Sequence, residues 1–315
     1  GAVFQCELAT LKADAFLDAA AAQIPPPNLM GPVNSVAPLD KGRMALASVG
    51  SKSKELFLVD PRAQEAKDRL RAVLLPDPLG GKLLAYGGGL LAPTAGGQVL
   101  LLDPVSGRNL VEPFQPRLEG TAQFLWRDAH AIGHEVLLAD ARNRLFRLGV
   151  KNEPKPHLAA LAEVGVTRPI VSPVAAIDKA VYAVDSAGTV LVFQLPDLKP
   201  GPTGRSVGNC LGGPRRAGHG VRLASEDQVY CLDAGQKLLW KSALPAGPVA
   251  GPPLETGNTL VLAATSGLIW KIDAGTGKEL ARLDTGKPLA TGPVSLGQHL
   301  LVGAYDGTLC RVKMP

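Results

Sequence analysis

The sequence has few aromatic residues, few charged residues and no long hydrophobic run. Aromatic residues make up 4% of the 315 positions, which argues against binding single-stranded nucleic acid by stacking bases on rings. No stretch approaches the ~18 apolar residues of a membrane span, and the N-terminus lacks the charged-then-apolar pattern of a signal peptide. The net charge of +5 is mild for this length and does not resemble that of a dedicated nucleic-acid binder.

Cysteine is also scarce. The four cysteines (Cys6, Cys210, Cys231 and Cys310) form no C-x-x-C pair, and no two are adjacent. Three complete disulfide pairings and free thiols all remain open. Two groups could suggest a metal site, His130 with His134 and the set Cys210, His219 and Cys231. The first pair does not share a helix face, and the second set lacks the fourth ligand of a closed zinc site, so we predict no metal.

Glycine and proline, in contrast, are abundant, with 36 Gly and 27 Pro. An average chain has about 7% Gly and about 5% Pro. Such frequent helix breakers exclude a long-helix or coiled-coil protein. The hydrophobic fraction of 46% is high enough for a folded core and argues against disorder. These proportions favour a compact all-β protein with many turns.

A strand template repeats along the chain. Gly267–Asp273 (GLIWKID) resembles Gly97–Asp103 (GQVLLLD) and Asp227–Asp233 (DQVYCLD), and further copies begin at positions 54, 143, 188 and 307. The third and fourth positions are apolar or aromatic in every copy, and neighbouring side chains of a strand point to opposite faces. Both faces of these strands should therefore be buried. Other apolar strands precede and follow the template, and four short strands per ~40–45 residues are typical of a β-propeller blade.

We therefore predict a single all-β domain over residues 1–315, a seven-bladed β-propeller of four-stranded blades. The last blade lacks a fourth strand, and the N-terminal strand 2–8 aligns with residues 238–244. We expect this strand to complete the last blade and close the ring, which would remove two exposed sheet edges. The blades are expected at approximately 31–75, 76–117, 118–164, 168–205, 208–245, 247–285 and 289–313.

Two insertions near the first blade favour helix. The Ala-rich run near residues 10–24 predicts a short helix, because Ala is the best helix former. Residues 61–74 are also compatible with a helix, since Pro61 suits a first turn and Leu70 and Leu74 would share a face. These segments would either decorate the rim of the propeller or dock a partner.

Three segments resemble the repeat of the pyrroloquinoline-quinone-type β-propellers: Asp273–Leu280 (DAGTGKEL), Asp233–Trp240 (DAGQKLLW) and Tyr305–Leu309 (YDGTL). The resemblance is strongest from about residue 180 onward. Most proteins with this repeat bind no quinone and act as scaffolds or interaction domains. One relative is the non-catalytic outer-membrane assembly lipoprotein propeller, and the resemblance favours the periplasmic or cell-envelope side.

The quinone enzymes of that family carry a disulfide between adjacent cysteines and a calcium site of carboxylates and an amide. Neither can be mapped onto this sequence. The resemblance thus implies a non-catalytic branch without a cofactor, a protein-interaction or scaffold propeller within a larger bacterial assembly. The alternative is an enzyme or small-ligand binder, including a quinone-type redox enzyme, that uses the central channel.

The densest charge cluster lies in Gly-rich loops around the predicted fifth blade. It consists of Arg205, Arg215, Arg216, His219 and Arg222. Guanidinium groups bind carboxylate and phosphate through paired hydrogen bonds. The cluster is either a solvated rim or a docking surface for an acidic protein, and we take it as the candidate partner-binding rim.

Overall fold

The computed structural model describes residues 33–65, 68–117, 124–202, 204–217 and 220–315, together with the backbone of two short strands near the N-terminus. The chain divides into two compact units, Gly1–Thr167 and Arg168–Pro315. The described residues contain no α-helix, and their 3-10 positions are a turn at Asp40–Gly42 and the single residue Asp68. The described part therefore contains no helix with the length and apolar character needed to cross a membrane.

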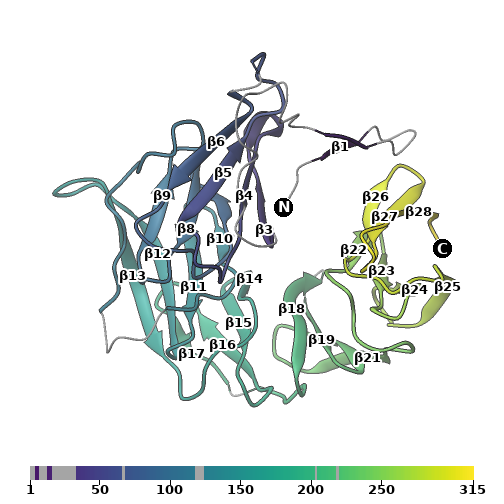
Figure 1. Cartoon of the computed structure of the whole chain (residues 1–315). Helices are drawn as coiled ribbons and strands as arrows, with labels where there is room; N and C mark the ends of the chain where they lie inside the picture. Colours follow the sequence, from purple (N-terminus) through teal and green to yellow (C-terminus); the bar gives the residue numbers. More distant parts are fainter. Residues whose placement is uncertain are drawn as a thin grey trace. The chain divides into compact units, whose positions relative to one another are not determined.

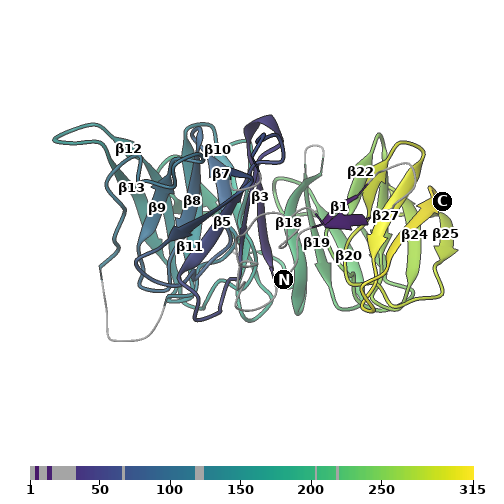
Figure 2. The same ribbon diagram turned by 45° about the horizontal axis from the view of Figure 1, so that its top comes forward.

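Besides the short pair of β1 (Phe4–Cys6) and β2 (Ala13–Ala15), the first unit contains three sheets of sequential antiparallel strands (Figures 1 and 2). The first comprises β3 (Ser35–Pro38), β4 (Met44–Ala47), β5 (Glu55–Val59) and β6 (Leu70–Leu74). The second comprises β7 (Leu84–Tyr86), β8 (Gly89–Pro93) and β9 (Val99–Leu102). The third comprises β10 (His130–Ile132), β11 (Glu135–Asp140), β12 (Arg144–Lys151) and β13 (His157–Gly165).

The second unit contains four sheets of the same design. The first comprises β14 (Ala175–Ile177), β15 (Ala180–Val184), β16 (Val190–Gln194) and β17 (Lys199–Pro200). The second comprises β18 (Cys210–Ala217), β19 (Gly220–Ser225), β20 (Gln228–Leu232) and β21 (Leu238–Ala243). The others are β22 (Leu254–Thr256), β23 (Thr259–Ala263), β24 (Leu268–Asp273) and β25 (Glu279–Asp284), and then β26 (Val294–Leu296), β27 (His299–Gly303) and β28 (Leu309–Lys313). The all-β, seven-bladed propeller architecture is confirmed.

The repeated template forms the third strand of each blade, and β24 shows why its pattern is apolar. Ile269 and Trp270 are neighbours in sequence and both are fully buried. Ile269 packs in a cluster with Leu300 and Val302 of the last blade, whereas Trp270 packs with Trp240 of the preceding blade. β24 is thus covered on both faces by neighbouring blades of the same unit, and burial of such apolar side chains supplies most of the driving force for packing.

The aspartate that ends the template organises the following turn. Asp273 Oδ1 accepts hydrogen bonds from the amides of Gly275 and Thr276, at 3.1 and 2.8 Å, and from the Thr276 hydroxyl at 2.8 Å. These donors hold the pKa of the Asp273 carboxyl below its usual value. The turn then passes through Gly277 with a φ of 70°, a conformation that glycine adopts without strain.

Near the first blade, the structure has strands within both segments for which the sequence favours helix. Leu70–Leu74 forms β6 and pairs with β5, and Ala13–Ala15 forms β2. The remainder of the segment 10–24 lies outside the described residues. The helix prediction is wrong at these strands because propensity is a weak preference that pairing with a neighbouring strand overrides. In β6, Val73 packs into the first core cluster, which a helix exposed on the rim would not provide.

The N-terminal strand has a different neighbour from the one expected. β1 (Phe4–Cys6) pairs with β2 (Ala13–Ala15), Phe4 opposite Ala15, and the last sheet contains the three strands β26, β27 and β28. Closure of the last blade by strand 2–8 is therefore not seen among the described strand pairs. A local hairpin closes a shorter loop, at a smaller entropic cost, than pairing with the far end of the chain. The single-domain assignment and its blade boundaries stay predictions.

Candidate functional site

The structure separates Arg205 from the other arginines of the predicted rim. The amide of Val190 donates to the carbonyl of Arg205 at 3.0 Å, which places Arg205 beside the end of β15 that leads into β16. Arg216 forms an ion pair with Asp178, just before the other end of β15, at 3.2 Å. Five residues of strand at about 3.3 Å each separate the two ends of β15. Arg205 therefore belongs to a different part of the surface.

The remaining arginines lie on the β18–β19 hairpin. Arg215 of β18 stands directly opposite Arg222 of β19, and Arg216 stands opposite Val221. β18 has eight residues, whereas the first strand of each other blade has three or four. Its register with β19 shifts twice between Cys210 and Arg215. His219, which sequence analysis assigned to the same rim, lies outside the described residues.

Arg222 is a buried residue rather than an exposed rim residue, with a relative exposure of 8%. Its Nη2 donates to Glu255 Oε1 at 2.6 Å and to the Arg216 carbonyl at 3.5 Å, while its Nε has no hydrogen-bond partner among the described residues. Burial lowers the pKa of Arg222, and the Glu255 carboxylate opposes that shift. The sequence carried a signal for this burial, because Arg222 interrupts the apolar run of a blade strand.

Arg215 and Arg216 are exposed but differ in their partners. Arg216 and Asp178 both have more than half of their side chains exposed, and such pairs contribute about 0–1 kcal/mol. Arg215 forms no ion pair in the described part of the chain. The hairpin thus brings three guanidinium groups together with two carboxylates, and among the described residues Arg215 has no ion-pair partner.

The cysteines of the β18–β21 blade are not activated as nucleophiles. Cys210 and Cys231 are free thiols, and so is Cys310 of the last blade. Burial raises the pKa of Cys210 to about 11 and also raises the pKa of Cys231. Since the thiolate is the reactive form, both side chains remain protonated at neutral pH. No group of three or more His, Cys, Asp or Glu residues is arranged to hold a metal in the part of the chain that the structure describes.

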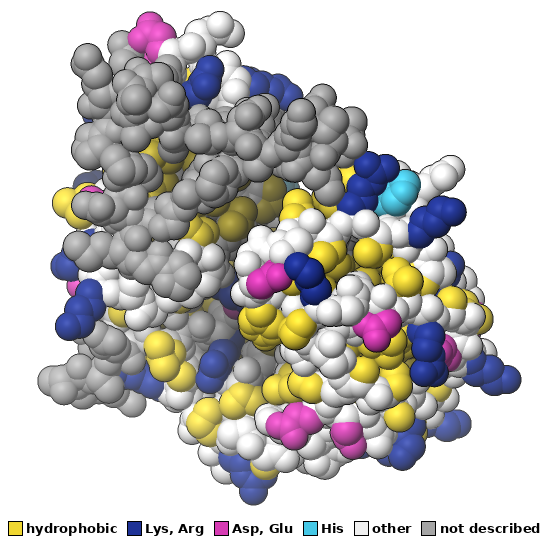
Figure 3. Space-filling view, turned by 45° about the vertical axis from the view of Figure 1, so that its right-hand side comes forward, with side chains coloured by type: hydrophobic (Ala, Val, Ile, Leu, Met, Phe, Trp, Pro, Cys, Tyr) yellow, Lys and Arg dark blue, Asp and Glu magenta, His cyan; other side chains and the backbone are white. Residues whose placement is uncertain are grey.

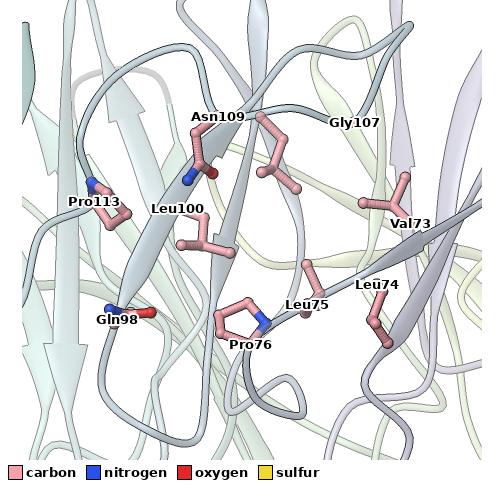
Figure 4. A pocket seen from close by; sticks show the side chains of 10 residues that line it. Val73, Leu74, Leu75, Pro76, Gln98, Leu100, Gly107, Asn109 and Pro113 are labelled. Atoms are coloured by element: carbon pink, nitrogen blue, oxygen red, sulfur yellow. The ribbon is translucent and has the colours of Figure 1, made fainter.

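A hollow of about 370 Å³ lies beside β6 and β9 (Figure 4). None of its lining side chains is titratable, and the only polar ones are the amides of Gln98 and Asn109. The lining consists of Val73, Leu74, Leu75, Pro76, Gln98, Leu100, Leu102, Gly107, Asn109 and Pro113. With no acid or base in its wall, the hollow suits apolar side chains better than it suits a reaction. No motif of the sequence predicts this hollow.

The hollow arises because the second blade has an irregular outer edge. After β9 the chain pairs with that strand at single bridges, Leu102 with Asn109 and Val99 with Phe114. Between them, Glu112 turns away and bonds to the start of β13, its amide donating to the Pro156 carbonyl at 2.9 Å and its carbonyl accepting from the Leu158 amide at 2.9 Å. A second hollow of about 320 Å³ lies along the same segment and includes Lys155 and Pro156.

On the described part of the face drawn in Figure 3, Lys and Arg side chains do not gather into one patch. Lys and Arg side chains are scattered there among hydrophobic and acidic side chains. A dispersed pattern of this kind favours local contacts by individual arginines over a long-range field that would attract a polyanion.

Comparison with known proteins supports the repeat and the fold. Residues 225–314 match the family of the outer membrane protein assembly factor BamB. The crystal structure of BamB from Moraxella catarrhalis is 19% identical and covers 89% of this chain and 82% of that chain, with a TM-score of 0.63. No curated protein matches the sequence.

Two other solved structures share the architecture. The computationally designed Ika8 protein is 12% identical, with 91% of this chain and 98% of that chain covered and a TM-score of 0.61. A chain of the mitotic checkpoint complex is 10% identical, with 91% and 92% covered and a TM-score of 0.63. Identities this low show the fold alone, whereas the match at residues 225–314 coincides with the strongest sequence repeats. The chain therefore has a β-propeller fold, and its residues 225–314 match the family with the pyrroloquinoline-quinone-type repeat.

Proposed function

We propose that this chain is a non-catalytic protein-interaction propeller, a scaffold domain or subunit of a larger bacterial assembly on the cell-envelope side. The observation that carries this proposal is the match of residues 225–314 to the family of an outer membrane protein assembly factor. The structural similarity to BamB over 89% of the chain supports it.

The described surface is compatible with this role. Leu74 is 78% exposed at the edge of the larger hollow, and Arg215 is exposed without an ion pair in the described part of the second unit. Arginine is enriched at protein interfaces, and an exposed apolar side chain gains free energy when a partner covers it. A partner that covers such residues would gain both apolar burial and charge-assisted hydrogen bonds.

The test is direct binding to purified outer-membrane assembly components. The tagged full chain is expressed in the envelope of a Gram-negative cell and cross-linked, and each recovered component is then purified and titrated against the chain by calorimetry. We expect a complex of fixed stoichiometry with one of them, and none when the designed propeller replaces the chain. Failure of every recovered component to bind the purified chain would contradict the proposal.

The redox alternative has its own measurement. Anything that binds the folded state raises the unfolding temperature by mass action. We expect added pyrroloquinoline quinone and calcium to leave the unfolding temperature of this chain unchanged. A dose-dependent rise would favour the quinone-type enzyme over the scaffold.

A further inference from the structure

Two arginines face each other across neighbouring strands of the β18–β19 hairpin. Arg215 and Arg222 form a direct cross-strand pair, and residues in that position have Cβ atoms about 4.5–5.5 Å apart on the same face of the sheet. Like charges placed in this way destabilise the pair. A hairpin that carries them needs compensating negative charge nearby.

The described residues compensate this charge only in part. Glu255 binds Arg222 Nη2, but more than half of the Glu255 side chain is exposed, so its charge is partly screened by solvent. Asp178 is occupied on the far side of the hairpin by Arg216. Arg222 Nε is buried with no hydrogen-bond partner in the described part of the chain, which is an unfavourable state for a polar group. The hairpin therefore retains an excess of positive charge next to Arg215.

We propose that the β18–β19 hairpin binds a carboxylate side chain of an acidic segment in a partner protein. The exposed Arg215 guanidinium donates the hydrogen bonds, and buried Arg222 adds a second positive charge that solvent screens weakly. This inference rests on the proposed interaction role and names the chemistry of the partner. It places the contact on Arg215 and Arg222 and excludes Arg205.

A protein segment fits the surroundings better than a free anion. β18 also carries Leu211, which is 48% exposed. An extended segment that places a carboxylate at Arg215 can bury an apolar side chain against the same strand. A free anion would gain only the electrostatic part of the interaction, which salt weakens at an exposed site.

The experiment measures binding of a short fluorescein-labelled peptide that alternates Glu with Leu and Ser, by fluorescence polarisation on the full chain. We expect R215Q to weaken binding about tenfold, because charge-assisted hydrogen bonds are lost. R205Q is the matched control, since it removes the same charge from an exposed arginine at the other end of β15. Equal losses in R215Q and R205Q would show a general charge effect and overturn the proposal, as would the absence of peptide binding.

A second variant separates the effect from structural damage. E255Q removes the carboxylate that competes for Arg222, so we expect it to tighten peptide binding, the opposite of what a misfolded hairpin would do. Weaker binding in E255Q, with an unchanged circular dichroism spectrum, would contradict the proposed electrostatics. A Gln-for-Glu version of the peptide is expected to bind at least about tenfold more weakly than the acidic peptide.

Further outcomes distinguish a small anion from a protein segment as the ligand, and failure of this inference from failure of the proposed function. If inorganic phosphate displaces the peptide as effectively as an unlabelled acidic peptide does, the site holds a small anion, and the assignment to a partner segment falls. If R215Q leaves the affinity for a purified envelope component that binds the chain unchanged, this inference fails while the interaction role stands. If no partner binds at all, the proposed function fails independently of the peptide result.

Discussion

The indole Nε1 of Trp240 donates a hydrogen bond to the carbonyl of Ala274 at 3.1 Å. This bond joins the last strand of one blade to a turn of the next. The ring of Trp240 also covers Gly277, and a Cβ added at that glycine would lie 2.4 Å from the ring. The blade interface here depends on a tryptophan and on the absence of a side chain opposite it.

The first prediction concerns this contact. Gly277→Ala should destabilise the second unit strongly, because the new methyl group collides with Trp240 and because φ is 70°. Gly257→Ala is the matched control, with a φ of 58° but no atom within 4 Å of the added Cβ. Urea unfolding followed by tryptophan fluorescence measures both variants. If both lose the same stability, the contact with Trp240 contributes nothing.

The second prediction removes only the hydrogen bond. Trp240→Phe retains most of the aromatic packing but leaves the Ala274 carbonyl without its donor. We expect a loss of about 0.5–1.5 kcal/mol, the net contribution of a typical hydrogen bond, because the Ala274 carbonyl is only partly buried. The urea midpoint measures the change. A variant as stable as the wild type would show that water replaces the indole at the Ala274 carbonyl.

The third prediction concerns a buried ion pair in the first unit. Asp140 is completely buried, and its carboxylate accepts from the amides of Arg142 and Arg144 and from the Arg144 guanidinium, each at 2.9 Å. Asp140→Ala leaves these donors unpaired and should cost about 3–5 kcal/mol.

The matched control for Asp140 is an exposed pair of the same unit. Asp128 bonds to Lys82 at 2.9 Å, with the side chains 41% and 54% exposed. Asp128→Ala should cost less than about 1 kcal/mol. Denaturant titration of the two variants gives the comparison, and similar losses would contradict the dominant effect of burial.

The fourth prediction concerns alkaline pH. The Cys210 pKa is about 11 in the folded protein and about 8.5 in an unfolded chain, because burial disfavours the thiolate. The resulting contribution to stability is complete below the unfolded value and is lost as pH rises through the folded value. We expect the urea midpoint of the wild type to fall more steeply above neutral pH than that of Cys210→Ala. Parallel curves would show that ionisation of this thiol is not coupled to unfolding.

The repeat made the architecture predictable. Residues such as Ile269 and Trp270 are consecutive and apolar, and only a strand buried between two neighbouring blades explains both. Turn residues reinforced the prediction, because a turn depends on its own few residues. Asp273 supplies a side-chain acceptor for the turn, and Gly277 adopts its positive φ. Because the strand and turn pattern recurs in every blade, one copy that departs from it does not change the predicted architecture.

Features that occur once were harder to predict. The segment 70–74 has helix-compatible spacing, yet it forms a strand because β5 offers an edge to pair with. The hollow beside β9 forms because the backbone of Glu112 bonds to Pro156 and Leu158. No local sequence pattern predicts these long-range bonds.

The candidate site was predicted in part. Sequence proximity grouped Arg205 with Arg215, but a strand separates them in space. The burial of Arg222 could have been inferred from its place in an apolar strand, whereas its pairing with Glu255 of the next blade could not.

The detour at Glu112 has a consequence for how the first unit opens. Because Leu110 and Phe114 bond to β9 while Glu112 bonds to β13, neither blade can release its outer edge without breaking bonds to the other. Segments tied in this way open together as one cooperative unit. In native-state hydrogen exchange, the amides of Glu112 and Leu158 should therefore exchange with a common free energy of opening, although they belong to different blades.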